Sequence, residues 1–300
     1  MNFTEQQLIT WSKPVSTSED QKCQNAINQI TTALKAKFGS KISIFLQGSY
    51  RNNTNVRQNS DVDIVMRYDN SYYSDLQRLS EDDKAAYNAQ RVSSGYNFDE
   101  LKADTQAALK AVLTTDVERK NKCIQVNGNT YRVTADVIPC FVLKRFKTLQ
   151  TIEAEGIKFY SDDNHEIISF PNQHYSNGTA KTEQTFRLYK RMVRILKVIN
   201  YRLIDNGTIS DKLASSFFIE CLVYNVPNVN FISGNYTQTL RNVIVKIYED
   251  MKSNADYTEV NQLLWLFSNK NPRTRKDALD FMQYCWDCLV TANGTQRKTC

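Results

Sequence analysis

Residues 47–65 read QGSYRNNTNVRQNSDVDIV, and this stretch decides how the rest of the chain is interpreted. An apolar run at 42–46 precedes it and predicts a strand that ends at Gly48-Ser49. After a polar stretch, Asp61 and Asp63 stand at the entry of a second predicted strand. Because side chains at i and i+2 of a strand share a face, these two carboxylates would lie side by side. Two like charges in that arrangement favour a bound cation between them.

A third carboxylate, Asp136, is expected to join this pair. Asn127-Gly128 lies between two alternating runs, 122–126 and 130–142, and predicts a hairpin whose second strand carries Asp136. A charge in such an apolar strand is costly without a partner. If that strand neighbours the Asp-x-Asp strand, the three acids converge and provide the hard oxygen ligands that Mg²⁺, or Mn²⁺, prefers. Two ions held about 3.5–4 Å apart would activate an attacking hydroxyl and stabilise a leaving pyrophosphate, with Asp136 helping to deprotonate the hydroxyl.

The Gly48-Ser49 turn is predicted to hold a triphosphate. Glycine allows positive φ and a close approach of the backbone to phosphate, and successive N–H groups in such a turn bind anions. Gln47 and Ser60 flank the two motifs and are weaker candidates for the same site. An isolated Gly-Ser or Asp-x-Asp is usually a solvated surface turn. Their combination with a later acid in an apolar strand favours a metal and phosphate site.

Composition indicates an ordinary globular protein with more than one lobe. The chain has 300 residues, 41% hydrophobic and 23% charged, without a repeat or an apolar run long enough to cross a membrane. Residues 1–13 lack the apolar stretch of a signal peptide, so a cytoplasmic protein with reduced cysteines is expected. Its net charge of +6 would suit anionic substrates if the charge is clustered. Cys285 and Cys288 lack the second pair of ligands that a zinc site needs, and two buried thiols on one helix are preferred.

The hydrophobic pattern predicts an α+β fold. A helix at 19–38, the strands above and a mixed, mostly helical segment at 76–113 make a front half with a small mixed sheet. The back half is predicted to be helical from about residue 182, with further helices at 211–224, 240–252, 258–266 and 275–291. We expect an N-terminal lobe at 1–178 packed on a C-terminal helical lobe at 179–300, with the active-site cleft between them.

The longer pattern resembles a known family. The order Gly48-Ser49, Asp61-Val62-Asp63, Asp136 resembles the polymerase-β-like nucleotidyltransferase superfamily, and residues 47–65 as a whole are similar to the bacterial relatives of cyclic GMP-AMP synthase, the CD-NTases. Further similar stretches are ADVIP at 135–139, FPNQH at 170–174, VRILK at 193–197 and SSFFIECL at 215–222. The resemblance covers about residues 20–225, and oligoadenylate synthases share the same plan.

The resemblance implies a Mg²⁺-dependent enzyme that makes cyclic di- or trinucleotide second messengers from nucleoside triphosphates in anti-phage defence of the CBASS type. It implies that Lys197 and Ser216 contact phosphate and that Phe217 stacks on a base. From the residues alone, Lys197 also fits the solvated basic face of an amphipathic helix, with Lys190 the second candidate. Phe217 alone would most often be core. His165 and His174 are interpreted as structural or loop residues.

Two other functions remain open from the sequence. An RNA-end or oligonucleotide nucleotidyltransferase of the same superfamily would need a basic track for a polynucleotide, and the basic residues concentrate instead on one helix. No nucleic-acid activator is therefore evident, and a regulatory protein partner cannot be identified. A catalytically silent nucleotide sensor is disfavoured by the intact acids at all three positions.

Overall fold

The computed structural model describes residues 3–56, 61–268 and 272–290, which divide into two compact units. The sheet unit comprises Ser16–Tyr50 and, among the described residues, 61–172. The helical unit comprises, among the described residues, 3–15, 51–56 and the chain from Gln173 onward. The helical unit therefore includes the segment that connects Gly48-Ser49 to Asp61. The predicted lobe boundary at residue 178 stays a prediction.

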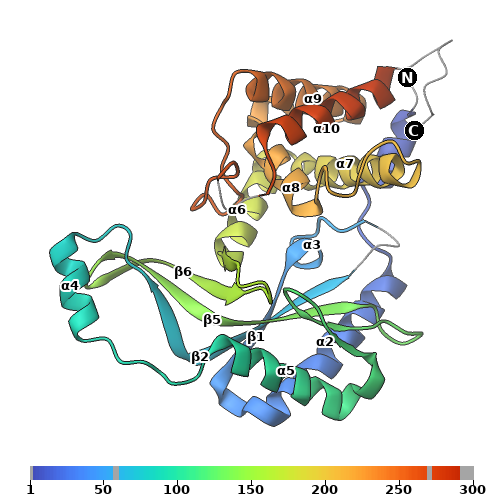
Figure 1. The fold of residues 1–300 in the computed structure, drawn as a ribbon. Coiled ribbons are helices and arrows are strands. Elements are labelled where there is room, and N and C mark those ends of the chain that lie inside the picture. The colour runs from blue at the N-terminus through green and yellow to red at the C-terminus, as the bar shows by residue number, and fades with distance from the viewer. Residues whose placement is uncertain (1–2, 57–60, 269–271, 291–300) are drawn as a thin grey trace. The chain divides into compact units, whose positions relative to one another are not determined.

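A mixed sheet forms the centre of the sheet unit (Figure 1). Its main path runs β1-β2-β5-β4-β3, while β6 pairs with β5 and β7 pairs with β6. The long strand β5 pairs with β4 near its beginning and with β6 along its second half. Their bounds are β1 Ile42–Gln47, β2 Val62–Asp75, β3 Val117–Arg119, β4 Ile124–Val126, β5 Ala135–Thr148, β6 Thr151–Tyr160 and β7 Glu166–Ser169.

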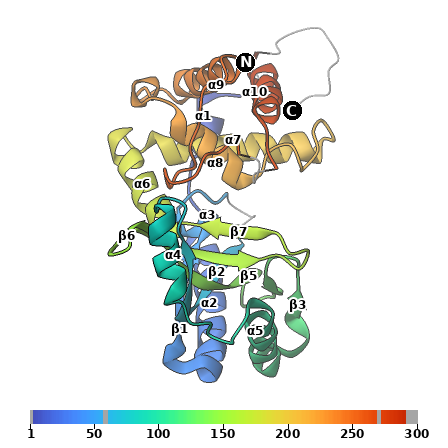
Figure 2. The ribbon, with the colours of Figure 1, turned by 60° about the vertical axis from the view of Figure 1, so that its left-hand side comes forward.

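Two helices, α2 (Thr17–Phe38) and α5 (Phe98–Leu113), pack against the sheet and bury its core (Figures 1 and 2). Ser16 caps α2 by accepting a hydrogen bond from the backbone N–H of Glu19, and Gly39 ends it at a φ of 58°. The buried faces of α2, α5, β2 and β5 form one hydrophobic cluster. The short helices α3 (Gly48–Arg51) and α4 (Glu81–Ala89) follow β1 and β2, respectively.

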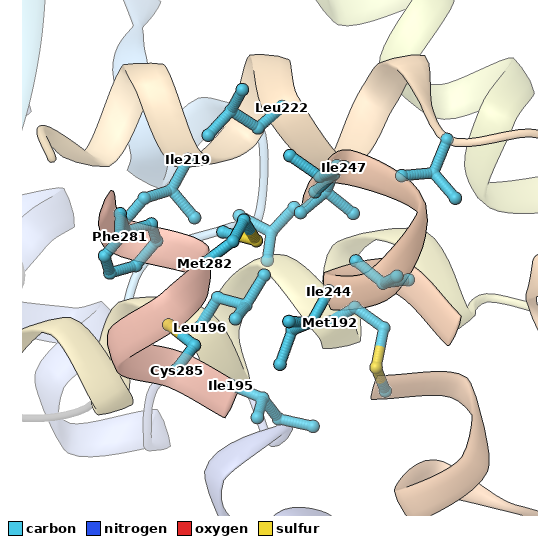
Figure 3. Close-up of a cluster of buried hydrophobic side chains, with 14 of the residues drawn as sticks. Met192, Ile195, Leu196, Ile219, Leu222, Ile244, Ile247, Phe281, Met282 and Cys285 are labelled. Atoms are coloured by element: carbon cyan, nitrogen blue, oxygen red, sulfur yellow. The ribbon is translucent and has the colours of Figure 1, made fainter. Parts of the chain in front are cut away.

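The helical unit has a separate hydrophobic core (Figure 3). Side chains from α7, α8, α9 and α10 meet there, including Leu196, Leu222, Ile244 and Phe281. Helix α7 supplies much of this core because its apolar residues recur at helical spacing. The helices of the unit are α1 Glu5–Trp11, α6 Pro171–Gln184, α7 Leu188–Asp205, α8 Ser216–Asn225, α9 Tyr236–Lys252 and α10 Arg275–Val290.

The structure confirms the α+β fold class and corrects several predicted elements. Residues 258–266 are not a helix but turns with an isolated bridge between Thr258 and Trp265. The helix predicted at 211–224 begins only at Ser216. The hairpin exists as β4 and β5, yet residues 127–134 form a longer loop than the two-residue turn that Asn127-Gly128 suggests. The end of the last predicted helix, Thr291, lies outside the described residues.

None of the described helices combines the length and the apolar character needed to cross a membrane. Cys285 and Cys288 are both buried on α10, as predicted. Cys285 is a free thiol.

Candidate active site

Asp61, Asp63 and Asp136 lie where β2 and β5 begin. These strands run parallel, and Asp63 is the register partner of Asp136 on the neighbouring strand. Asp61 directly precedes β2, two residues before Asp63, and therefore shares its face. The sequence thus predicted correctly that the strand of Asp136 lies beside the Asp-x-Asp strand. The roles assigned to the three acids stay predictions.

The charges in this cluster oppose one another. Burial raises the pKa of Asp61, and the nearby charge of Asp136 raises it further. On the other side of β5, Gln125 is paired with Asp136 in the β4 register, and its side-chain amide donates a hydrogen bond to Asp136 Oδ1 at 3.2 Å. Burial, followed by the charge of Asp136, raises the pKa of Cys123 to about 12 and keeps that thiol neutral. Gln125 and Cys123 orient one acid but do not offset its charge.

Gly48 permits the close packing of the Gly48-Ser49 turn on Asp63. It has a φ of 68°, as its role in the turn predicted. A Cβ atom at this position would lie only 1.8 Å from Asp63 Oδ2. Gln47, the preceding residue, pairs with Asp63 across the β1–β2 ladder. Gly48-Ser49 and Asp63 therefore form one local structure, although fourteen positions separate Ser49 from Asp63 in the sequence.

The donor set fits Mg²⁺ or Mn²⁺, because three carboxylates offer only hard oxygen ligands. The unfavourable charge that raises the pKa of Asp61 is the kind that a cation would offset. Within the described part of the chain, no group of three or more acidic, histidine or cysteine side chains is arranged so that it could hold a metal ion. The acids share a face and a strand register without forming a preformed cage, and the metal requirement stays a prediction.

Lys197, a predicted phosphate contact, is buried in the helical unit. Its side chain donates hydrogen bonds to the backbone oxygen of Thr54 at 3.0 Å and to Thr54 Oγ1 at 3.3 Å. With 1% of its surface exposed, it does not lie on a solvated face, so that alternative is wrong. Arg194 is buried beside it and donates to the backbone oxygens of Ser12 and Asn53. The helical unit thus holds Asn53 and Thr54, which follow the Gly48-Ser49 turn in the sequence.

The other predicted nucleotide contacts lie at the beginning of α8. Ser216 is its first residue, and its hydroxyl lies 3.3 Å from the hydroxyl of Tyr201. Phe217 is 42% exposed, so its interpretation as a core residue is wrong, and its ring remains accessible for stacking. Ser60 lies outside the described residues.

A buried acid that the sequence analysis missed, Glu220 of α8, contacts both α6 and the segment 51–56. Glu220 is 3% exposed; its Oε1 lies 3.0 Å from His174 Nε2, and its Oε2 accepts from Thr54 Oγ1 at 2.9 Å. Burial raises the pKa of Glu220, but the hydrogen bond and charge of His174, together with Lys197 and Thr54, lower it below its usual value. A glutamate inside the apolar run of α8 was the available signal, because a buried charge requires partners. His174 is structural, as predicted, with its ring 5.8 Å from that of Phe217.

Two further cations face one aromatic ring in the helical unit. The guanidinium carbon of Arg51 lies 5.0 Å from the ring centre of Tyr175, and Lys190 Nζ lies 5.7 Å from it. Burial lowers the pKa of Lys190. Arg51 ends the short helix that begins at Gly48, so a cation immediately follows the phosphate turn.

Comparisons with known proteins agree with this arrangement. Two family descriptions match the chain: the Second Messenger Oligonucleotide or Dinucleotide Synthetase domain over residues 4–161, and the cGAS/DncV-like nucleotidyltransferase C-terminal helical domain over residues 176–290. The chain is 81% identical to a cyclic dipurine nucleotide synthase from Elizabethkingia meningoseptica, over 96% of this chain and 99% of that protein. It is 36% identical to a cyclic dipyrimidine nucleotide synthase, CdnE, from Cecembia lonarensis, over 96% and 98% of the two chains.

A solved structure shows the same fold. The Elizabethkingia meningoseptica CdnE cyclic dinucleotide synthase, solved with GTP and Apcpp, superimposes with a TM-score of 0.84 at 75% identity, covering 96% of this chain and all of that one. The similarity therefore extends over both units rather than over the acidic motif alone.

Proposed function

This chain belongs to the CD-NTase family of nucleotidyltransferases, and we propose that it is a cyclic dinucleotide synthase acting on purine nucleoside triphosphates. The observation that carries the proposal is the parallel register of Asp63 and Asp136, with Asp61 on the same face and Gly48 packed against Asp63. The choice of purines rests on the 81% identity to a cyclic dipurine nucleotide synthase.

In the proposed reaction, the hydroxyl of one nucleotide attacks the α-phosphate of another, and pyrophosphate leaves. Asp61, Asp63 and Asp136 would hold two Mg²⁺ ions, which neutralise charge on the phosphates and lower the pKa of the attacking hydroxyl. Gly48 and Ser49 bind the triphosphate through backbone N–H groups and one hydroxyl. Asp136, oriented by Gln125, helps to deprotonate the attacking group.

Residues of the helical unit would orient the nucleotide. Phe217 is exposed and rigidly mounted on α8, which suits stacking on a base. Ser216 and Lys197 remain the proposed phosphate contacts; for Lys197 this requires its ammonium to exchange the Thr54 contacts for phosphate oxygens. We further propose that the enzyme works in the cytoplasm, where nucleoside triphosphates are available, and that its product signals in anti-phage defence.

The test is incubation of the enzyme with all four nucleoside triphosphates and Mg²⁺, without RNA, followed by mass spectrometry. We expect a cyclic dipurine product and pyrophosphate, and neither from the Asp61→Ala/Asp63→Ala double variant. If product forms only when an RNA primer is added, the proposal is wrong and the chain is an RNA-end nucleotidyltransferase. Pyrophosphate release by the double variant at the wild-type rate would contradict the assigned site.

A further inference from the structure

A large pocket lies in the sheet unit, far along the strands from the acids. It has a volume of about 1040 Å³ and is formed by α4, residues 90–97 and the second halves of β2 and β5. The nearest lining residue on β2, Asn70, comes seven residues after Asp63, which corresponds to roughly 23 Å along a strand. Figure 1 shows α4 at this far end of the long strands, away from α2 and α5. The pocket is thus separate from the proposed catalytic site.

Aromatic rings make up much of its wall and floor. The centres of Tyr73 and Phe141 are 5.6 Å apart, those of Tyr87 and Phe146 are 5.3 Å apart, and Tyr96 packs on Phe141 at 6.5 Å. Tyr87 is also fixed by its hydroxyl, which lies 2.5 Å from Ser74 Oγ and donates to that of Tyr72 at 3.2 Å. Rings held in this way offer preformed surfaces for a flat aromatic ligand.

The polar lining favours an anion. The residues around the pocket include no aspartate or glutamate, and Arg91 is their single charged side chain. Arg91 is exposed and forms no ion pair with any described residue. Side-chain amides complete the polar lining and can both donate to and accept from a base edge; they belong to Asn70, Gln90, Asn97 and Gln150.

A buried hydroxyl at the pocket also lacks a partner. Ser71 Oγ is inaccessible to solvent and has no hydrogen-bond partner among the described residues. It lies where the β2–β5 register shifts between Tyr68 and Tyr72, so the ladder skips the residues around it. Buried polar atoms are nearly always satisfied in proteins, and such bulges occur preferentially beside functional sites.

We propose that this pocket binds a purine nucleotide, with the base against the aromatic rings and the phosphate at Arg91. Two sources share that chemistry: the substrate triphosphates and the cyclic dinucleotide product. The proposal depends on the proposed function only for the identity of the product. Because the lining lacks carboxylates, binding here needs no divalent cation, whereas binding at Asp61, Asp63 and Asp136 does.

The experiment is calorimetric titration of the full chain in EDTA with GTP, cyclic di-GMP and cyclic di-AMP in turn. The Asp61→Ala/Asp63→Ala background prevents turnover and weakens binding at the catalytic site. We expect one binding event per chain, weakened at least tenfold by Arg91→Ala and abolished by Ala86→Trp, which fills the pocket from α4. Lys147→Ala, which removes an exposed cation from β5 outside the pocket, should bind as the parent does.

Each outcome decides the proposal. Tighter binding of a cyclic dinucleotide identifies a product site, and tighter binding of GTP identifies a substrate-sensing site. Absence of binding by all three ligands, or equal binding by the Arg91→Ala variant and its parent, overturns the proposal, provided that circular dichroism shows the variants folded. Synthesis by the wild-type enzyme is measured separately, so a failure of this proposal leaves the proposed function intact, and the reverse also holds.

Discussion

Two clusters of charged side chains, one in each unit, are built on opposite principles. Asp61, Asp63 and Asp136 in the sheet unit carry charges of one sign, and burial together with Asp136 raises the pKa of Asp61. Glu220 in the helical unit is paired with His174 and Thr54, near Lys197, and its pKa is lowered. Within the first cluster the charges of Asp61 and Asp136 repel each other, whereas in the second cluster Glu220 is paired with a histidine and a threonine hydroxyl. This difference is the one that the proposed function predicts between a site for metal and nucleotide and a cluster that stabilises the helical unit.

The largest expected effect is on catalysis in the first cluster. Asp136→Asn keeps the shape of the side chain and removes a metal ligand, so activity should fall by more than the about 10²–10³-fold that loss of one electrostatic contact costs. Stability should not fall, because a repulsion with Asp61 is removed. Pyrophosphate release and thermal unfolding measure the two effects. A variant that is fully active, or that unfolds at clearly lower temperature, would contradict the comparison.

The second cluster should show the reverse pattern, with stability affected first. Glu220→Ala leaves His174 and Lys197 without their buried acid, and removing one partner of a buried ion pair typically costs about 3–5 kcal/mol. Urea unfolding gives the loss directly. Thr54→Val serves as the milder matched variant, because it removes one neutral hydrogen-bonding group, with an expected cost of about 1 kcal/mol. Equal losses of unfolding free energy from both variants would mean that the charge of Glu220 contributes no more to stability than one neutral hydrogen-bonding group.

Gly48→Ala tests how closely the phosphate turn and the acids are joined. The added methyl group would meet Asp63 Oδ2 and would sit at a φ of 68°, so Asp63 must move. A displacement of about 1 Å in a catalytic group can cost about 10²-fold in rate. The steady-state turnover number reports it, with Gly207→Ala as the control: that glycine has a similar φ of 67° and open space around it. Similar turnover by the Gly48 and Gly207 variants would show that the contact with Asp63 is unimportant.

The smallest expected effect is on the pH dependence of stability. A lowered pKa in the folded state means that Glu220 stabilises the fold above its unfolded value, near 4.5, and that this contribution is lost as pH falls through the lower folded value. The stability difference between wild type and Glu220→Gln should therefore be constant from pH 7 to about 5 and shrink in more acidic solution. Unfolding curves across this range test it. A difference that grows on acidification would show that the pKa of Glu220 is raised.

The shared face of Asp61 and Asp63 and the positive φ of Gly48 could be predicted from the sequence because strand alternation and positive φ are local properties. Asp63 and Asp136 needed only the further assumption that their strands are neighbours. The burial of Lys197 could not be predicted, since it depends on Thr54, 143 positions away. The partners of Glu220, which are His174 and Thr54, also lie far from it in the sequence and could not be predicted.

The false helix at 258–266 has a local cause that competes with helical spacing. Val260, Leu263 and Leu264 recur at i, i+3 and i+4, which is the spacing of an apolar helix face. The side chain of Asn261, however, accepts from the backbone N–H groups of Leu263 and Leu264, and the chain turns at Gln262 with a φ of 59°. Side-chain hydrogen bonds of this kind offer the backbone an alternative to the helix. The spacing of apolar residues gives no information about them.

The course of residues 51–56 has a practical consequence for engineering. Thr54 and Asn53 belong to the sheet half by sequence, yet their hydrogen bonds go to Glu220, Lys197 and Arg194. A chimera that exchanged the helical halves of two relatives at one splice point near residue 178 would separate these partners. Such a chimera should therefore take two segments from the same relative: the C-terminal helices and, as a second and much smaller insert, residues 51–56.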